Sequence, residues 1–255
     1  MIKPDYIFNI FKNLRIKEEF IIIHSDIVAF AFENFSIQKL WEMIFYGLGK
    51  EKTYLMPSFT FSFNKKKKWD YYLTKSETGY LSEFFRKKIS TFRTIHPVHS
   101  LSVYGNNSKE VPKHNCKSSF GRGSTWEWIC KNKHVCNLSL GLPLNGGATI
   151  CHYPEELVGV NYREYINLKG KLYLKNGKVV ESDYEYYSRV NNKNYIGIND
   201  WRKPENDLLK YKIMKSYTFN KNRILINYQN AKKTSDFLIK KIRSNQNYLG
   251  NLIKI

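Results

Sequence analysis

The stretch Phe20-Ile21-Ile22-Ile23-His24 is the part of the sequence that decides the fold class. An uninterrupted apolar run of this length predicts a short strand that is buried on both faces, as in a parallel sheet. The next segment has apolar residues at helical spacing, with Ser36 suited to cap its start and Gly49 to end it. Thr53 to Met56 then predicts a second strand. Strand, helix and strand in this order predict a parallel pair covered by a helix, and hence an α/β protein.

The same alternation continues beyond these elements. We expect a helix over residues 81–88 and two further core strands over residues 101–104 and 134–140. With no internal repeat, linker or clean boundary in the sequence, we expect one domain over residues 1–255.

Around Lys171 the pattern changes to that of antiparallel structure. The sequence KLYLKNGKVV, residues 171–180, predicts a hairpin in which Asn176 and Gly177 supply the positive φ angles of a two-residue turn. After it we expect a strand over residues 223–227 and a helix capped near Ser235. The predicted sheet is therefore central and largely parallel, with an added antiparallel hairpin region.

The charge of the chain is strongly positive. Its 42 Lys and Arg exceed its 22 Asp and Glu and give a net charge of +20, which favours an anionic partner: nucleic acid, an anionic membrane surface or small phosphorylated ligands. Alternatively, the charge excess reflects a Lys- and Asn-rich proteome encoded by an AT-rich genome, which would raise the charge of any protein in it. The basic residues are spread along the chain, and no zinc-finger or RNA-recognition motif accompanies them, so we expect no nucleic-acid partner. We expect the run Lys65 to Lys68 to be a solvated loop.

Two further features set the expected compartment and cofactors. No apolar run is long enough to span a bilayer, and Met1 to Glu19 lacks the apolar centre of a signal peptide, so we expect a cytoplasmic protein without membrane insertion. Cys116, Cys130, Cys136 and Cys151 lack the spacing of metal or redox motifs and are expected to be buried free thiols. We therefore expect no metal.

One segment after a predicted strand combines the residues of a general base. His152 precedes an expected helix that opens with Glu155 and Glu156, and Pro154 is well suited to the first turn of that helix. The positive end of a helix disfavours the imidazolium, and a general base must be neutral. Either glutamate could orient the ring, and Thr149 adds a hydroxyl. The alternative interpretation is a helix-capping histidine beside solvated glutamates.

Other catalytic classes are not supported. The sequence has no GxSxG elbow of a serine hydrolase, and Gly121 to Ser124 lacks the lysine of a phosphate-binding loop.

Six segments, in order along residues 20 to 165, carry a resemblance to a known family. They are Ile22 to Ser25, Met56 to Thr60, Glu77 to Arg86, His96 to Ser100 with Gly105, Gly121 to Ser124, and Thr149 to Glu155. Together they resemble the aminoglycoside 3-N-acetyltransferase family. The likeness weakens over residues 166–255, where we expect acceptor specificity to lie.

The resemblance implies an α/β/α sandwich, acetyl-CoA as donor, and direct transfer to an amine without an acyl-enzyme. It implies that His152 deprotonates the amine, that Glu155 orients His152, and that Thr149 hydrogen-bonds the thioester oxygen as charge develops there. Pro154 departs from the family pattern and leaves open whether Glu155 or Glu156 is the partner.

The resemblance also implies a binding path for the cofactor. Ser25, Asp26 and Ser58 follow predicted strands and Ser100 directly precedes one; these four residues would lie along the pantetheine and phosphates of CoA.

The acceptor is predicted from charge. A net charge of +20 would repel a polycationic aminoglycoside and attract a diphosphate, so we expect the amine of a nucleoside-diphosphate-linked amino sugar, a surface-polysaccharide precursor. Tyr71, Tyr72, Trp126, Trp128 and Trp201 are candidates for stacking on its base. The alternatives are an aminoglycoside acceptor or, in another class, a non-catalytic module that binds nucleic acid or another anionic polymer.

Overall fold

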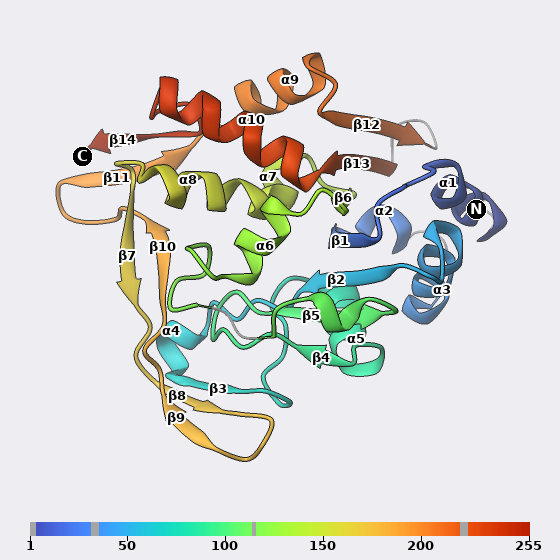
Figure 1. Cartoon of the computed structure of the whole chain (residues 1–255), viewed down its shortest axis with the longest axis horizontal. Coiled ribbons are helices and arrows are strands. Elements are labelled where there is room, and N and C mark those ends of the chain that lie inside the picture. The colour runs from blue at the N-terminus through green and yellow to red at the C-terminus, as the bar shows by residue number, and fades with distance from the viewer. Residues whose placement is uncertain (1–3, 32–35, 114–115, 220–223) are drawn as a thin grey trace.

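The computed structural model describes residues 4–31, 36–113, 116–219 and 224–255. Within these ranges the chain folds around a seven-stranded mixed sheet (Figure 1). From one edge to the other, its strands are β12 (Met214–Phe219), β13 (Ile224–Asn230), β6 (Val135–Leu140), β1 (Phe20–Ser25), β2 (Thr53–Pro57), β5 (Leu101–Gly105) and β4 (Phe92–Arg93). The four core strands expected from the sequence are therefore neighbours in one sheet.

The three central strands are parallel, whereas the flanking strands are antiparallel to their neighbours. β1 pairs in parallel with β2, where Phe20 lies opposite Thr53, and with β6, where Phe20 lies opposite Val135. β5 is antiparallel to β2, and β13 is antiparallel to β6. The α/β prediction is confirmed, with parallel pairing confined to the centre of the sheet.

Helices cover both faces of this sheet (Figure 1). The helices of the described ranges are α1 (Pro4–Asn13), α2 (Val28–Ala31), α3 (Ile37–Leu48), α4 (Phe63–Lys66), α5 (Tyr80–Lys88), α6 (Thr125–Lys131), α7 (Leu144–Gly147), α8 (His152–Val158), α9 (Arg202–Lys210) and α10 (Ala231–Ser244), with 3₁₀ turns η1 (Ser108–Glu110) and η2 (Ala148–Cys151). None of them has the length and apolar character of a membrane span.

The central strand β1 shows why the apolar run is uninterrupted. Ile21 and Ile23 pack into one core with side chains of α1, α3 and α5. Phe20 and Ile22 point to the opposite face and pack with side chains of α6, α8 and α10. Because successive strand residues point to opposite faces, both sets must be apolar when both faces are covered. This arrangement is the predicted α/β/α sandwich.

Three small sheets lie outside the main one and are formed mostly by the second half of the chain. Their strands are β7 (Arg163–Asn167) with β10 (Glu185–Arg189), β11 (Tyr195–Asn199) with β14 (Gly250–Lys254), and β3 (Lys68–Asp70) with β8 (Lys171–Tyr173) and β9 (Val179–Glu181). β8 and β9 form the expected antiparallel hairpin, while β3 joins β8 in parallel.

The turn of this hairpin differs from the prediction. Leu174 N–H donates to the carbonyl oxygen of Lys178 at 2.8 Å, and Gly177 N–H donates to that of Leu174 at 3.0 Å, so the loop has three residues. Of Asn176 and Gly177, only Gly177 has a positive φ, of 80°. One left-handed glycine is enough when a bulge closes the loop, so the expected two-residue turn was wrong.

The predicted helix ends are right at α3 and wrong at α10. The Ser36 side chain accepts the N–H three residues on, and Gly49 ends α3. At α10 the cap is Asn230, whose side chain accepts an N–H in the same way. Ser235 is a buried residue inside that helix, because the apolar face of α10 begins earlier than the sequence indicated. Arg223, the first residue of the strand expected before it, lies outside the described residues.

Candidate active site

The candidate site begins where β6 ends. Gly141 turns the chain with a φ of 73°, a conformation that favours glycine. A Cβ at this position would lie 2.2 Å from the carbonyl oxygen of Asp26, so a larger residue would push the end of β6 away from the end of β1. The chain then enters α7 and η2.

The helix that follows starts earlier than predicted. α8 begins at His152, not at Glu155, because His152 already has helical φ and ψ after η2. Pro154 fits within the first turn, where its missing N–H costs no hydrogen bond. Thr149, His152 and Glu155 are thus spaced three residues apart on consecutive helical turns at the carboxyl end of β6.

His152 and Glu155 form a close pair. The His152 Nδ1 lies 2.6 Å from Glu155 Oε2. The Glu155 side chain is fully buried, whereas 23% of the His152 side chain is exposed. A carboxylate only accepts hydrogen bonds, so the imidazole proton lies on Nδ1 and Nε2 keeps a free lone pair.

Glu155 is held by three further side chains from later in the sequence. Its Oε1 accepts hydrogen bonds from Tyr162 Oη at 3.0 Å and Asn199 Nδ2 at 2.9 Å. Arg163 Nε lies 2.8 Å from its Oε2. Because the buried carboxylate is paired with a buried guanidinium, the charge of Glu155 is already compensated before His152 is considered.

The pairing of Glu155 with Arg163 explains the pKa shifts of His152 and Glu155, which together are called the dyad below. Burial lowers the pKa of His152 below its ordinary value, Arg163 lowers it further, and Glu155 acts in the opposite direction. Burial by itself would raise the pKa of Glu155, but His152, Arg163 and Asn199 together lower it. The result is an ionised Glu155 beside a neutral His152. A neutral ring was expected from the helix N-terminus, but its main cause is burial.

Glu156 is placed differently. Its Oε1 accepts a hydrogen bond from Tyr165 Oη at 3.3 Å, and burial raises the pKa of its carboxyl group. Of the two glutamates that the sequence left open, Glu155 is the one in contact with His152.

His152 opens into a pocket of about 410 Å³. The pocket is lined by Phe61, His99, Phe120, Asn145, Gly146, Thr149, His152, Arg163, Tyr186, Tyr187, Ser188, Arg189, Asn199 and Trp201. Two of these described residues are cations, Arg163 and Arg189, and none is a carboxylate. Thr149 lines the same pocket as His152.

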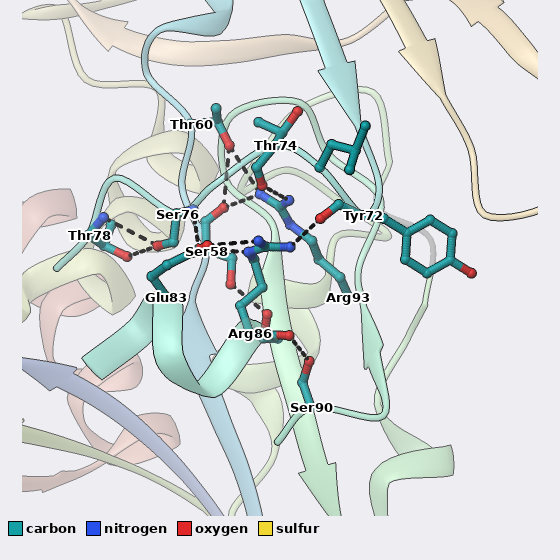
Figure 2. A network of polar contacts seen from close by, with 12 residues as sticks. Ser58, Thr60, Tyr72, Thr74, Ser76, Thr78, Glu83, Arg86, Ser90 and Arg93 are labelled. Atoms are coloured by element: carbon teal, nitrogen blue, oxygen red, sulfur yellow. Dashed lines mark hydrogen bonds and ion pairs between the residues drawn. The ribbon is translucent and has the colours of Figure 1, made fainter. Parts of the chain in front are cut away.

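Ser58 and Ser100 are not brought to this pocket. Both are completely buried, and Figure 2 shows Ser58 within a polar network around Arg93. The Arg93 guanidinium donates to the Ser58 and Thr74 carbonyl oxygens and to the Thr60 hydroxyl, and its Nε donates to Ser100 Oγ. Ser100 Oγ in turn donates to the Ser58 carbonyl oxygen at 2.8 Å. The Ser58 hydroxyl itself contacts Ser102 Oγ at 2.6 Å, so both serine hydroxyls have internal partners at the ends of β2 and β5 and do not line the pocket.

Ser25 and Asp26 lie at the end of β1, outside the pocket lining. The Ser25 hydroxyl has no hydrogen-bond partner among the described residues. Asp26 Oδ1 accepts the N–H of Val28 at 3.0 Å at the start of α2.

Sequence reasoning missed the residues that complete the site. Arg163, Arg189 and Asn199 come from β7, β10 and β11; Arg163 lies at the end of the stretch that carries the resemblance, and the other two lie beyond it. Trp201, one of the aromatic candidates, does line the pocket, with its ring centroid 6.2 Å from that of His152. Trp126 is instead fully buried in the core. Among the described residues no group of three or more His, Cys, Asp or Glu could hold a metal.

Comparisons with known proteins identify the family that the sequence segments resemble. A model of the aminoglycoside 3-N-acetyltransferase family matches residues 22–242. A search of curated proteins finds no significant match.

Solved structures show the same fold at low sequence identity. AAC-IIIb in binary complex with CoASH has a TM-score of 0.78 at 14% identity, covering 95% of this chain and 97% of that one. AAC(3)-Xa has a TM-score of 0.77 at 16% identity, with 97% and 94% covered. The YokD protein from Bacillus subtilis has a TM-score of 0.74 at 15% identity, with 96% and 100% covered. Because the family model spans well over half of the sequence, the chain belongs to the aminoglycoside 3-N-acetyltransferase family and is an acyltransferase.

Proposed function

We propose that this enzyme transfers the acetyl group of acetyl-CoA directly to an amine, with His152 as the general base. The observation that carries the proposal is the 2.6 Å contact between His152 Nδ1 and the buried Glu155 carboxylate. It fixes the tautomer in which Nε2 is unprotonated, on a ring that lines a pocket. A helix cap or a core histidine would not need a buried carboxylate balanced by Arg163.

The proposed reaction is one addition and one elimination. The amine nitrogen attacks the thioester carbon, a C–N bond forms, and the carbonyl π electrons move to oxygen. His152 Nε2 takes one proton from the amine. The oxyanion then collapses, the C–S bond breaks, and the thiolate accepts the proton from His152, giving an amide and free CoA.

Thr149 is the proposed donor to the developing oxyanion. Its position one turn before His152, in the same pocket, supports this role. A positioned donor at such a site contributes about 3 kcal/mol to transition-state stabilisation.

The proposed donor is acetyl-CoA, since the neighbouring AAC-IIIb structure is described as a complex with CoASH. Ser25 remains the proposed contact among the serines, because its hydroxyl lacks a partner among the described residues at the end of β1. Asp26 would border the same path, through its backbone more than through its carboxylate, which a phosphate would repel.

Aminoglycosides are the first proposed acceptors. The family description names them, and a neighbouring structure with a TM-score of 0.76 is described as AAC-VIa bound to sisomicin. The comparisons support this acceptor better than the nucleotide-linked amino sugar expected from charge.

A specific observation keeps the nucleotide-linked amino sugar as a second candidate. The described pocket lining contains Arg163 and Arg189 but no carboxylate. Arg163 is balanced by Glu155, and Arg189 adds a further positive charge. A polycation would meet repulsion here, whereas a phosphate-bearing amine would be attracted.

The test is free-thiol release from acetyl-CoA with two matched acceptor panels, one of aminoglycosides and one of nucleoside-diphosphate amino sugars. Turnover with either panel supports the proposed transferase, and the active panel identifies the acceptor class. An Arg189→Gln variant sharpens the result: it should weaken a phosphate-bearing acceptor and leave or improve an aminoglycoside. Absence of turnover with both panels would contradict the proposed function.

A further inference from the structure

A second histidine system faces the same pocket and is not used by the dyad. His96 and His99 lie in the segment between β4 and β5, and their side chains are connected through Ser119. His96 is fully buried and His99 is 7% exposed. His99 lines the pocket beside His152.

The proton positions of this system follow from its hydrogen bonds. His96 Nδ1 accepts the backbone N–H groups of Val98 at 3.1 Å and His99 at 2.9 Å. A nitrogen that accepts amide protons cannot carry a proton of its own in the neutral ring. The His96 proton therefore lies on Nε2, which is 3.1 Å from Ser119 Oγ and 3.3 Å from the Glu185 carbonyl oxygen.

Ser119 then determines the state of His99. Because His96 Nε2 can only donate, the hydroxyl proton of Ser119 has one acceptor left among its described partners, His99 Nδ1 at 2.6 Å. His99 Nδ1 is thus an acceptor, and its own proton lies on Nε2. With Nδ1 turned to Ser119, the Nε2–H group is the one that remains for a ligand in the pocket.

The surroundings of His99 keep this donor uncharged. Its ring packs against those of Phe59, Phe61, Phe120 and Tyr186, at centroid distances of 4.9 to 5.9 Å. Burial lowers the pKa of His99 well below its ordinary value, and His96, His152 and Arg163 lower it further. A fixed neutral N–H in an aromatic pocket suits an oxygen that gains negative charge, and it needs no reorganisation during the reaction.

We propose that His99 Nε2–H donates a hydrogen bond to the acetyl carbonyl oxygen during transfer, together with Thr149, while His96 and Ser119 fix its tautomer. This role rests on the proposed transferase function. His99 keeps its proton throughout, so the proton balance of the reaction is unchanged. Ser119 is a positioning residue that acts only through His99.

Kinetics with two substitutions at His99 test the donor. His99→Phe keeps a ring but removes the N–H, and we expect kcat to fall about 100-fold, as for other oxyanion donors, with little change in KM for acetyl-CoA. His99→Gln restores an N–H at similar reach and should recover much of that loss. His134→Gln, at a partly exposed histidine with a side-chain exposure of 51%, is the matched control and should behave as wild type. A His99→Phe enzyme with wild-type kcat would overturn the role.

The tautomer is tested separately, without any substrate. In the full chain labelled with ¹⁵N-histidine, we expect NMR to show His99 protonated on Nε2 and unprotonated on Nδ1, and Ser119→Ala to leave a mixture of the two tautomers. A wild-type His99 protonated on Nδ1 overturns the inference even if the enzyme is active. Absence of turnover on both acceptor panels would instead contradict the proposed function, while the spectrum still decides whether the Nε2–H donor exists.

Discussion

Two histidines line one pocket with their protons on opposite nitrogens. His152 donates through Nδ1 to the Glu155 carboxylate, and His99 accepts through Nδ1 from the Ser119 hydroxyl, both at 2.6 Å. The two distances are equal, but a carboxylate can only accept, whereas the Ser119 proton has His99 as its remaining acceptor. In the proposed reaction Nε2 of His152 therefore serves as the base and Nε2 of His99 as a hydrogen-bond donor. The partner on the far side of an imidazole thus decides whether the ring accepts or donates a hydrogen bond in the pocket.

The largest effect is expected from removing the base. His152→Gln retains a polar side chain of similar length but cannot take up a proton, so kcat should fall by about 100-fold or more. Thiol release measures the rate, and a circular dichroism melt checks that the fold is kept. A variant with near-normal kcat would contradict the base assignment.

The next effect is expected at the hydroxyl beside His152. Thr149→Ala should raise the activation barrier by about 2 to 4 kcal/mol if the hydroxyl serves the oxyanion. Thr149→Ser keeps the hydroxyl and is the matched control. Equal rates for the alanine variant and wild type would leave Thr149 with a structural role only.

Removing the orienting carboxylate should affect stability as well as rate. Glu155→Gln leaves the buried Arg163 without a counter-charge, and the free energy of unfolding should drop by about 3 kcal/mol. Urea titration measures this drop, and Glu156→Gln is the adjacent control, because Glu156 has no contact with His152 or Arg163. If both variants unfold at the same urea concentration, the Glu155 network does not contribute as described.

The smallest effect is a shift in pH dependence. The base must be unprotonated, so kcat should decline as pH falls through the pKa of His152, which lies below its ordinary value of 6.5. Arg163 lowers this pKa, so Arg163→Gln should move the acidic limb of the profile to higher pH. A shift to lower pH in this variant would contradict the electrostatic account.

The fold was predictable where its signals are local. The apolar run of β1 indicates burial on both faces of the strand, and the residues that cap α3 lie directly beside that helix in the sequence. The turn at Gly177 and the cap at Asn230 were predicted less well, because several arrangements of the same residues satisfy the local hydrogen bonds. The extent of the domain, residues 1–255, stays a prediction.

The site was predictable for the same reason and to the same limit. Thr149, His152 and Glu155 lie close together in the chain, so the resemblance could single them out as candidates, although it left Glu155 and Glu156 open as partners. Arg163 and Asn199 reach Glu155 from separate strands, and such distant contacts leave no local pattern.

The serines show a second limit. Ser58 follows a strand end as a ligand residue would, yet its side chain is buried against Ser102 Oγ, while its carbonyl oxygen accepts a hydrogen bond from Arg93 (Figure 2). Sequence position therefore predicted where the chain turns but not which side chains are exposed there.

The most direct test of the account is a pH titration of His152 by ¹⁵N NMR, with the His152→Gln spectrum used to assign its signals. The account predicts a neutral ring at pH 7, protonated on Nδ1 and unprotonated on Nε2, which becomes an imidazolium only below pH 6.5. An imidazolium at pH 7, or a neutral ring protonated on Nε2, would contradict it.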